Sequence, residues 1–172
     1  MIKFAWIVYG KLLTEQISIM TLSAVLKSRG VDSLLIYSNS EKEILQKVRG
    51  LRPHMIGYSL MYGSHWRYYD LSKKIRRNFP DIIQVAGGPF TTFYPQAIHE
   101  FPVDATCVGE GDVSLPSLIK KVGEGKPIEE TKGFHFRVDN HIKTNEAENL
   151  LSQIDQLPFP ESAAPTALPS QE

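Results

Sequence analysis

The chain has 172 residues, of which 42% are hydrophobic and 22% charged, and this balance predicts one globular domain with a short extension and excludes a wholly disordered chain. Nineteen basic residues balance nineteen acidic ones, and the resulting zero net charge argues against a protein dedicated to binding nucleic acid. The single cysteine, Cys107, excludes a disulfide scaffold and a cysteine-ligated iron–sulfur cluster within this chain.

Apolar runs of strand length alternate with amphipathic stretches of helix length along the first 125 residues. We expect strands at residues 3–9, 32–37, 54–60, 81–86 and 104–108. We expect helices at residues 14–30, 41–50, 64–79, 96–100 and 112–122. Five strand–helix units in a row predict a doubly wound α/β domain, a Rossmann-like five-stranded parallel sheet of order 2-1-3-4-5 with helices on both faces.

Two of these helices have features that predict where they begin and which side is buried. Thr14 and Ser64 precede the first and third helices and can act as their N-cap residues. Four apolar residues of the first helix share one face that we expect to pack inward: Ile17, Met20, Ala24 and Val25. The basic run at 73–77 flanks an inward Ile75, so we interpret it as the solvated face of the third helix and not as a nucleic-acid site.

The last fifty residues differ in composition from the alternating region. Residues 133–138 and 141–144 flank Asp139-Asn140, a pair that favours a tight turn and predicts a β-hairpin. Four prolines in the last fifteen residues predict a linker. We therefore divide the chain into a Rossmann-like domain (1–125), a hairpin extension (126–150) and a linker (151–172) toward a domain that this chain lacks.

The first apolar run, at residues 4–9, is too short to cross a bilayer. It lacks a small-residue cleavage site before Lys11, which argues against a signal peptide. We expect a soluble, cytoplasmic chain with no membrane partner.

The loops after the strands are the places where a ligand is expected. In a doubly wound sheet, ligands bind at the carboxyl ends of the strands, where the strand order reverses. Gly87-Gly88 and Gly109-Glu110-Gly111 follow the fourth and fifth strands and would let a ligand approach the backbone, while Ser59 ends the third strand with a hydroxyl. Paired glycines are also common in ordinary tight turns, so these loops alone leave the function open.

Four common functional classes of this fold lack their sequence signatures here. Gly10-Lys11-Leu12-Leu13 after the first strand matches neither a phosphate-binding loop nor a dinucleotide fingerprint, and it is not the Ser/Thr-rich loop of a flavodoxin. The acidic residues of a phosphate-accepting receiver domain are missing there, and Ser59-Leu60 ends the third strand in place of an aspartate.

Six short motifs carry a more specific likeness: Glu15–Ser18, Pro53–Ser59, Gly87–Pro95, Val108–Asp112, the hairpin at 133–144, and Leu157–Pro160. In this order and spacing, the chain resembles the N-terminal cobalamin-binding domain of cobalamin-dependent radical S-adenosylmethionine enzymes of the methyltransferase and cyclase type, without their radical barrel. The resemblance implies that the corrin lies over the carboxyl ends of the strands and that the dimethylbenzimidazole tail inserts beside the sheet. It implies no catalytic residue and no protein ligand to the cobalt.

The resemblance also implies which residues bind the cofactor: Gly10, Lys11, Leu12, Leu13, Thr14, Ser59, Leu60, Tyr62, Gly87, Gly88, Pro89, Thr91, Val108, Gly109, Glu110 and Gly111. Among these, Ser59 and Leu60 would line the tail pocket. The loop at 10–14 would face the lower side of the cobalt, and Tyr62 would lie near the corrin edge.

One stretch departs from other cobalamin domains. The methionine synthase and mutase types carry Asp-x-His-x-x-Gly after the first strand, whereas residues 9–15 of this chain contain no histidine. This departure implies base-off binding without a histidine ligand. It also fits a module that binds no cofactor and docks a separate catalytic subunit, and an α/β domain for another nucleotide-like ligand stays open as well.

The catalytic half of such enzymes would need three cysteines for a [4Fe–4S] cluster and a site for S-adenosylmethionine. This chain has Cys107 alone, so methyl transfer would depend on a radical domain supplied in cis or in trans.

Overall fold

The strands form one sheet of seven. The computed structural model describes residues 1–10, 16–139, 141–149, 151–152 and 154–160. Its strands are β1 (Lys3–Tyr9), β2 (Asp32–Ser38), β3 (Met55–Ser59), β4 (Ile83–Gly87), β5 (Ala105–Cys107), β6 (Phe134–Val138) and β7 (His141–Thr144), in the order β2-β1-β3-β4-β5-β6-β7. The first five are parallel, so the predicted order 2-1-3-4-5 is confirmed.

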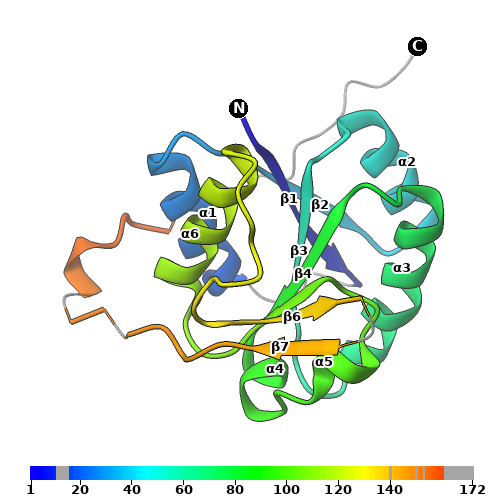
Figure 1. Ribbon diagram of the computed structural model, residues 1–172. Helices are drawn as coiled ribbons and strands as arrows, with labels where there is room; N and C mark the ends of the chain where they lie inside the picture. The colour runs from blue at the N-terminus through cyan, green and yellow to red at the C-terminus, as the bar shows by residue number, and fades with distance from the viewer. Residues whose placement is uncertain (11–15, 140, 150, 153, 161–172) are drawn as a thin grey trace.

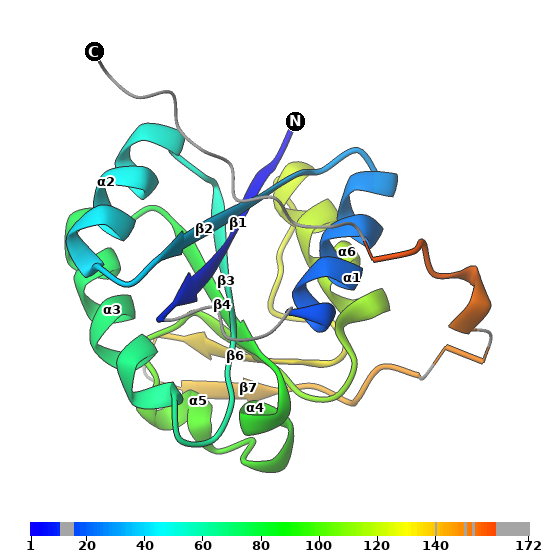
Figure 2. The ribbon, with the colours of Figure 1, turned by 180° about the vertical axis from the view of Figure 1, so that it is seen from behind.

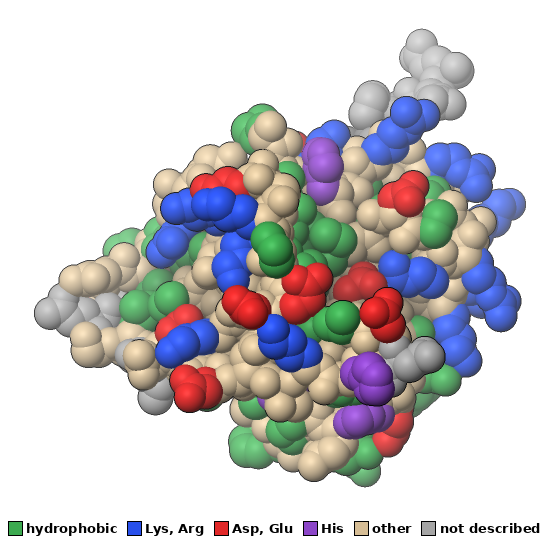
Figure 3. Space-filling model, in the orientation of Figure 1, with side chains coloured by type: hydrophobic (Ala, Val, Ile, Leu, Met, Phe, Trp, Pro, Cys, Tyr) green, Lys and Arg blue, Asp and Glu red, His purple; other side chains and the backbone are tan. Residues whose placement is uncertain are grey.

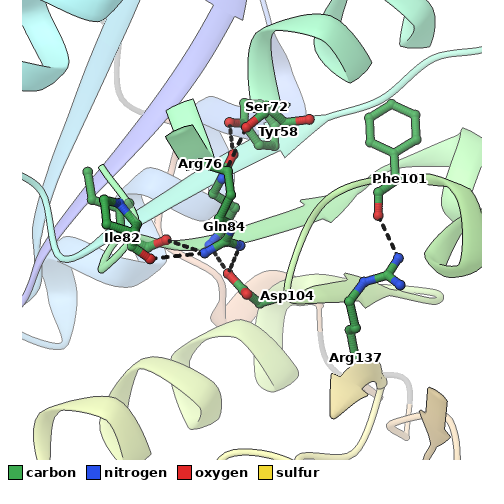
Figure 4. Close-up of polar contacts among 9 residues, drawn as sticks. Tyr58, Ser72, Arg76, Ile82, Gln84, Phe101, Asp104 and Arg137 are labelled. Carbon is green, nitrogen blue, oxygen red and sulfur yellow. Dashed lines mark hydrogen bonds and ion pairs between the residues drawn. The ribbon is translucent and has the colours of Figure 1, made fainter. Parts of the chain in front are cut away.

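The predicted hairpin is also confirmed, and it joins the main sheet. β6 pairs antiparallel with β5, and β7 pairs antiparallel with β6. Two contacts fasten it to the helix α5 (Ala97–Glu100) and the residue after it: the guanidinium of Arg137 donates to the carbonyl of Phe101 at 3.0 Å (Figure 4) and to the carbonyl of Ile98. The hairpin therefore covers the edge that β5 would otherwise expose.

Helices cover both faces of the sheet (Figures 1 and 2). They are α1 (Ile17–Ser28), α2 (Glu41–Leu51), α3 (His65–Asn78), α4 (Pro89–Phe93), α5 (Ala97–Glu100) and α6 (Gly111–Gly123), followed by the 3₁₀ turn η1 (Ile154–Gln156). We call the face covered by α1 and α6 the α1 side, and the face covered by α2, α3, α4 and α5 the α3 side. In the described residues, no helix is both long and apolar enough to cross a bilayer.

The helix starts differ in part from the predictions. Ser64 stands at the N-cap of α3, but its hydroxyl donates to the carbonyl of Met61 and does not cap the helix. The predicted cap Thr14 lies outside the described residues, and Gln16 occupies the N-cap position of α1. Helix α4 was not predicted. Pro89 begins it, where a fixed φ and a missing N–H suit the first helical turn.

A network of buried polar groups closes the α3 side (Figure 4). The hydroxyl of Tyr58 donates to Oε1 of Gln84 at 2.6 Å, and Nε2 of Gln84 donates to the carbonyl of Ser72 at 3.3 Å. The backbone N–H of Gln84 donates to Asp104 at 2.7 Å, and Asp104 pairs with Arg76 at 2.6 Å. These bonds join β3, β4 and α3, so the buried polar side chains of Tyr58 and Gln84 have partners within the chain.

Basic side chains gather over α2 and α3, at the right of Figure 3. On α3 they flank Ile75, which is fully buried as predicted. Lys74 pairs with Glu41, and the ammonium of Lys73 lies 4.2 Å from the ring centre of Tyr69. Part of the positive charge of this face is thus paired within the chain, with a carboxylate and with an aromatic ring.

Candidate functional site

A cavity of about 350 Å³ lies on the α1 side, at the carboxyl ends of the central strands. Strand residues alternate between faces, so the α1 side receives Met55, Gly57 and Ser59 from β3 and Val85 and Gly87 from β4. Near the carboxyl ends these side chains are small or missing. The sheet and the helices α1 and α6 therefore cannot close against each other there, and a hollow is left between them.

The wall of the cavity is mostly apolar. Trp6 of β1, Ile19 and Leu22 of α1, Leu115 of α6 and Phe134 of β6 line it. Its remaining lining comes from β3, β4 and β5, from the loops after β4 and β5, and from the helices α1, α4 and α6: Ser18, Gly57, Tyr58, Ser59, Val85, Ala86, Gly87, Gly88, Pro89, Thr92, Phe93, Cys107, Gly109, Glu110 and Gly111. An apolar hollow with a few polar groups at its rim suits an organic ligand with a flat apolar part.

Two neighbouring glycines of the cavity have different reasons to be glycine. Gly88 has a φ of +98°, and a Cβ there would lie 2.9 Å from the carbonyl oxygen of Leu60, so the turn itself requires glycine. Gly87 has an ordinary backbone conformation, and its Cβ would only touch the Cβ of Cys107 at 3.4 Å. Neither backbone strain nor a clash requires glycine at position 87. The missing side chain there serves to keep the cavity open.

Threonines hold the two glycine loops together. The hydroxyl of Thr91 is 2.7 Å from the carbonyl oxygen of Cys107, to which it donates. The hydroxyl of Thr92 accepts from the N–H of Gly109 at 3.1 Å and donates to the carbonyl of Gly88, also at 3.1 Å. Helix α4 thereby links the loop after β4 to the loop after β5 at the rim of the cavity.

The structure brings seven of the predicted site residues together around this cavity: Ser59, Gly87, Gly88, Pro89, Gly109, Glu110 and Gly111. The predicted residues Lys11, Leu12, Leu13 and Thr14 lie outside the described residues. Their roles in binding a cofactor stay predictions.

The other predicted residues lie elsewhere. Leu60 is fully buried in the core of the α3 side, and buried Thr91 supports the loops from behind. Gly10 and Val108 do not line the cavity; their N–H groups donate to the carbonyls of Ser38 and Gly133. Tyr62 is 87% exposed.

Tyr62 borders a second, more open hollow next to the cavity. Aromatic rings form most of this hollow, and His65 stacks on Phe90 with ring centres 4.2 Å apart. Pro89 and Phe93 line both hollows, so an aromatic shelf continues from the mouth of the cavity. Met61 and Trp66, both 56% exposed, lie near it in the sequence.

Two residues that line the cavity, Trp6 and Gly57, were not predicted as site residues. Trp6 on β1 pairs in register with Gly57 on β3, and a Cβ on Gly57 would lie 2.6 Å from the ring of Phe4 and 3.0 Å from the ring of Trp6. Glycine is therefore needed for these rings to lie against β3. A glycine inside a buried strand was the available signal.

Few charged or titratable groups reach the cavity. Burial raises the pKa of the Cys107 thiol to about 11, so the thiol stays protonated and inert at neutral pH. At the start of α6, desolvation and the neighbouring Glu110 raise the pKa of Asp112. Among the described residues, no cluster of three or more His, Cys, Asp or Glu could hold a metal ion.

Comparisons with known proteins agree with this geometry. A family model for the B12 binding domain matches residues 8–119. The chain is 22% identical over 120 residues to an uncharacterized methyltransferase of Pyrococcus horikoshii, covering 69% of this chain and 26% of that protein. It is 32% identical over 92 residues to the anaerobic magnesium-protoporphyrin IX monomethyl ester cyclase of Rubrivivax gelatinosus, covering 51% and 16%.

The fold is also found among solved structures. The cobalamin-dependent S-adenosylmethionine radical enzyme OxsB, with aqua-cobalamin and S-adenosylmethionine bound, superposes with a TM-score of 0.78 at 21% identity. The match covers 92% of this chain and 24% of that enzyme. The chain thus spans about a quarter or less of the length of these relatives.

Proposed function

The chain belongs to the B12-binding domain family, and from this premise we propose that it binds cobalamin base-off, with the nucleotide tail in the cavity of the α1 side and the corrin over the strand ends. The observation that carries the proposal is Gly87, whose missing side chain keeps the cavity open. No histidine occurs in residues 9–15, so that loop supplies no imidazole to the cobalt.

The residues of the cavity fit the tail. The rings of Trp6 and Phe134 and the side chain of Leu115 offer flat apolar surface to an aromatic base. A planar group the size of an aromatic side chain buries roughly 150–250 Å². At about 25 cal/mol per Å², this burial contributes roughly 4–6 kcal/mol. The rim offers backbone amides and the hydroxyl of Ser59 to the polar parts of a nucleotide.

The function of the chain is then to hold and orient a cofactor. Bound cobalamin supplies a cobalt centre that can carry a methyl group. The aromatic shelf of Tyr62, His65 and Phe93 would carry the edge of the corrin beside the cavity mouth. A radical S-adenosylmethionine domain with its [4Fe–4S] cluster, in cis or in trans, would perform the methyl transfer, in keeping with the methyltransferase and radical enzyme among the relatives.

An absorbance experiment tests the proposal. The purified chain is mixed with hydroxocobalamin and desalted, and the retained cobalt is measured together with the spectrum after reduction. We expect about one cobalt per chain and the bands of base-off cob(II)alamin, and these bands should keep their positions in His65→Ala. Complete loss of colour on desalting would overturn cobalamin binding and favour the cofactor-free docking module. Retained colour with base-on bands would overturn the placement of the tail.

A further inference from the structure

The strand residues that line the cavity of the α1 side lie at two levels. The register of the sheet places Trp6, Gly57 and Val85 side by side, and we call this row the inner level. Ser59 and Gly87 pair with each other two residues further along their strands, and we call this row, next to the mouth, the outer level. A ligand that enters at the carboxyl ends of the strands therefore passes the outer level before it reaches the inner one.

The two helices of the α1 side follow the same division. Each helix comes after a parallel strand and begins at the mouth, so its first turn lies near the outer level and its second turn lies deeper. Ser18 is in the first turn of α1, and Leu22 is in the second. In α6, Gly111 begins the helix and Leu115 lies one turn further in. On the helices, as on the sheet, the deeper lining residues are apolar.

Among the residues that the structure describes, the inner level presents carbon alone to a ligand. Gly57 has no side chain, and the side chains of Val85 and Leu22 are hydrocarbon. Nε1 of Trp6 is polar, but it has less than 1 Å² of accessible surface and is sealed inside the wall. The backbone groups of these strands pair with one another in the ladders between β1, β3 and β4. A ligand group that reaches the inner level therefore finds no hydrogen-bond partner in the described part of the wall.

The polar groups of the cavity gather at the outer level and the mouth. The side chains of Ser18, Ser59 and Glu110 line the cavity there. The hydroxyl of Thr92 joins the two glycine loops at the same height. A ligand that is polar at its outer end and apolar at its inner end matches both levels.

We propose that the cavity selects the cofactor by the polarity of its tail base: it accepts a tail that ends in a benzene ring, as in a benzimidazole or a phenol, and rejects a purine tail. This inference rests on the proposed function, because it needs a tail in the cavity. The pyrimidine ring of a purine carries nitrogen atoms where a benzimidazole has only carbon. At the inner level these nitrogens lose their water without gaining a partner, which costs affinity. Leu22 and Val85 are then specificity-determining residues.

The test compares two cobamides that differ in the tail base. A phenolic tail has no ring nitrogen for the cobalt and an adenine tail coordinates it only weakly, so neither ligand has to release a firmly held base before it binds. Cobinamide, which lacks the tail, gives the affinity of the corrin alone. Calorimetry measures the dissociation constants of the wild-type chain for all three. We expect the phenolic cobamide to bind at least about tenfold more tightly than the adenine cobamide, which is the cost of burying polar groups without partners.

Variants separate the polarity of the inner level from its size. Leu22→Gln brings an amide into the wall in place of a half-buried hydrocarbon of similar length, and Val85→Thr replaces a methyl group by a hydroxyl. Both should reduce the ratio between the two affinities several-fold, because the purine gains a partner. Leu22→Met is the matched control, since it changes the shape of the side chain and keeps it apolar, and it should keep the wild-type ratio. Thermal unfolding checks that each variant is folded.

The outcomes that overturn the inference differ from those that overturn the proposed function. Wild-type protein that binds the adenine cobamide as tightly as the phenolic one, or more tightly, would overturn the inference. An adenine penalty that keeps its wild-type value in both Leu22→Gln and Val85→Thr would do the same, because the size of the base would then explain it. Two cobamides that bind no more tightly than cobinamide, or a chain that binds none of the three, would overturn the proposed function itself.

Discussion

The two faces of one sheet differ in how they treat buried polar groups and volume. On the α3 side, β3 contributes Ile56 and Tyr58, which are packed, and the hydroxyl of Tyr58 is bonded to Gln84. On the α1 side, the same strand contributes Gly57 and Ser59, and a cavity lies over them. Alternate residues of a single strand thus stabilise the fold on one face and leave room for a ligand on the other.

The two faces also differ in whether their buried polar groups find hydrogen-bond partners within the chain. The α3 side satisfies Tyr58 and Gln84 within the chain, whereas the N–H of Trp6 on the α1 side has no acceptor among the described residues. A packed core favours complete satisfaction of its polar groups. The α1 side instead combines an open volume with a buried donor that has no acceptor among the described residues.

The largest expected effect is a loss of cobalamin affinity caused by filling the cavity of the α1 side. Gly87→Leu should weaken cobalamin binding at least about 100-fold, because the new side chain extends past Cys107 into the cavity. The midpoint of thermal unfolding should change little, since the backbone at Gly87 accepts a side chain. Gly87→Ala should give a smaller loss of affinity. Calorimetry and thermal unfolding measure both quantities, and wild-type affinity in Gly87→Leu would show that the tail binds elsewhere.

Gly88 provides the contrast. Valine at this position would combine a positive φ with contacts of 2.9–3.0 Å to the backbone of Leu60. Loss of binding in Gly88→Val would therefore report a disturbed fold as well as a filled cavity. Position 87 is the better place to separate the two effects.

A middle-sized effect is expected on the α3 side. Tyr58→Phe removes the donor to Gln84 Oε1 and leaves a buried amide oxygen unpaired. The free energy of unfolding, measured with urea, should fall by about 1–3 kcal/mol. Cobalamin affinity should be unchanged, because the side chain of Tyr58 packs in the core of the α3 side and its hydroxyl bonds to Gln84 there (Figure 4). A large loss of affinity in this variant would contradict the assignment of cofactor binding to the α1 side and of packing to the α3 side.

The smallest expected effect is a pH dependence of the free energy of unfolding, caused by the Cys107 thiol on the α1 side. Burial raises the pKa of Cys107 to about 11 in the folded chain, against 9.0 for an unperturbed thiol. The folded state therefore holds its proton more tightly, and the resulting stability is complete below pH 9 and is lost as the pH rises toward 11. Between pH 8 and 10 this loss amounts to about 1 kcal/mol.

Denaturant unfolding of the wild type and Cys107→Ala across this pH range measures the contribution. The difference in stability between the two proteins should shrink as the pH rises, because the alanine variant lacks the thiol. A difference that is constant from pH 8 to pH 10 would mean that the thiol is not shielded from water.

Local patterns determined much of the fold from the sequence alone. The five parallel strands, their order and the hairpin around Asp139 followed from apolar runs, their alternation with helices and a turn pair. Seven of the predicted site residues line one cavity, because loops at the carboxyl ends of parallel strands must meet at one edge. These features depend on residues close together in the chain or on the general topology of parallel sheets.

The tertiary structure alone decided the rest. In α1 the predicted inward residue Ile17 is 62% exposed, while Ile19 and Leu26 are buried, because packing against the sheet and α6 selects one apolar stripe among several. Trp6 was predicted only as a buried strand residue. Its unused N–H arises because Phe4 and Gly57, which lie on two different strands, fix the ring beside a cavity. Such a donor exists through contacts between distant residues, which no local pattern can specify.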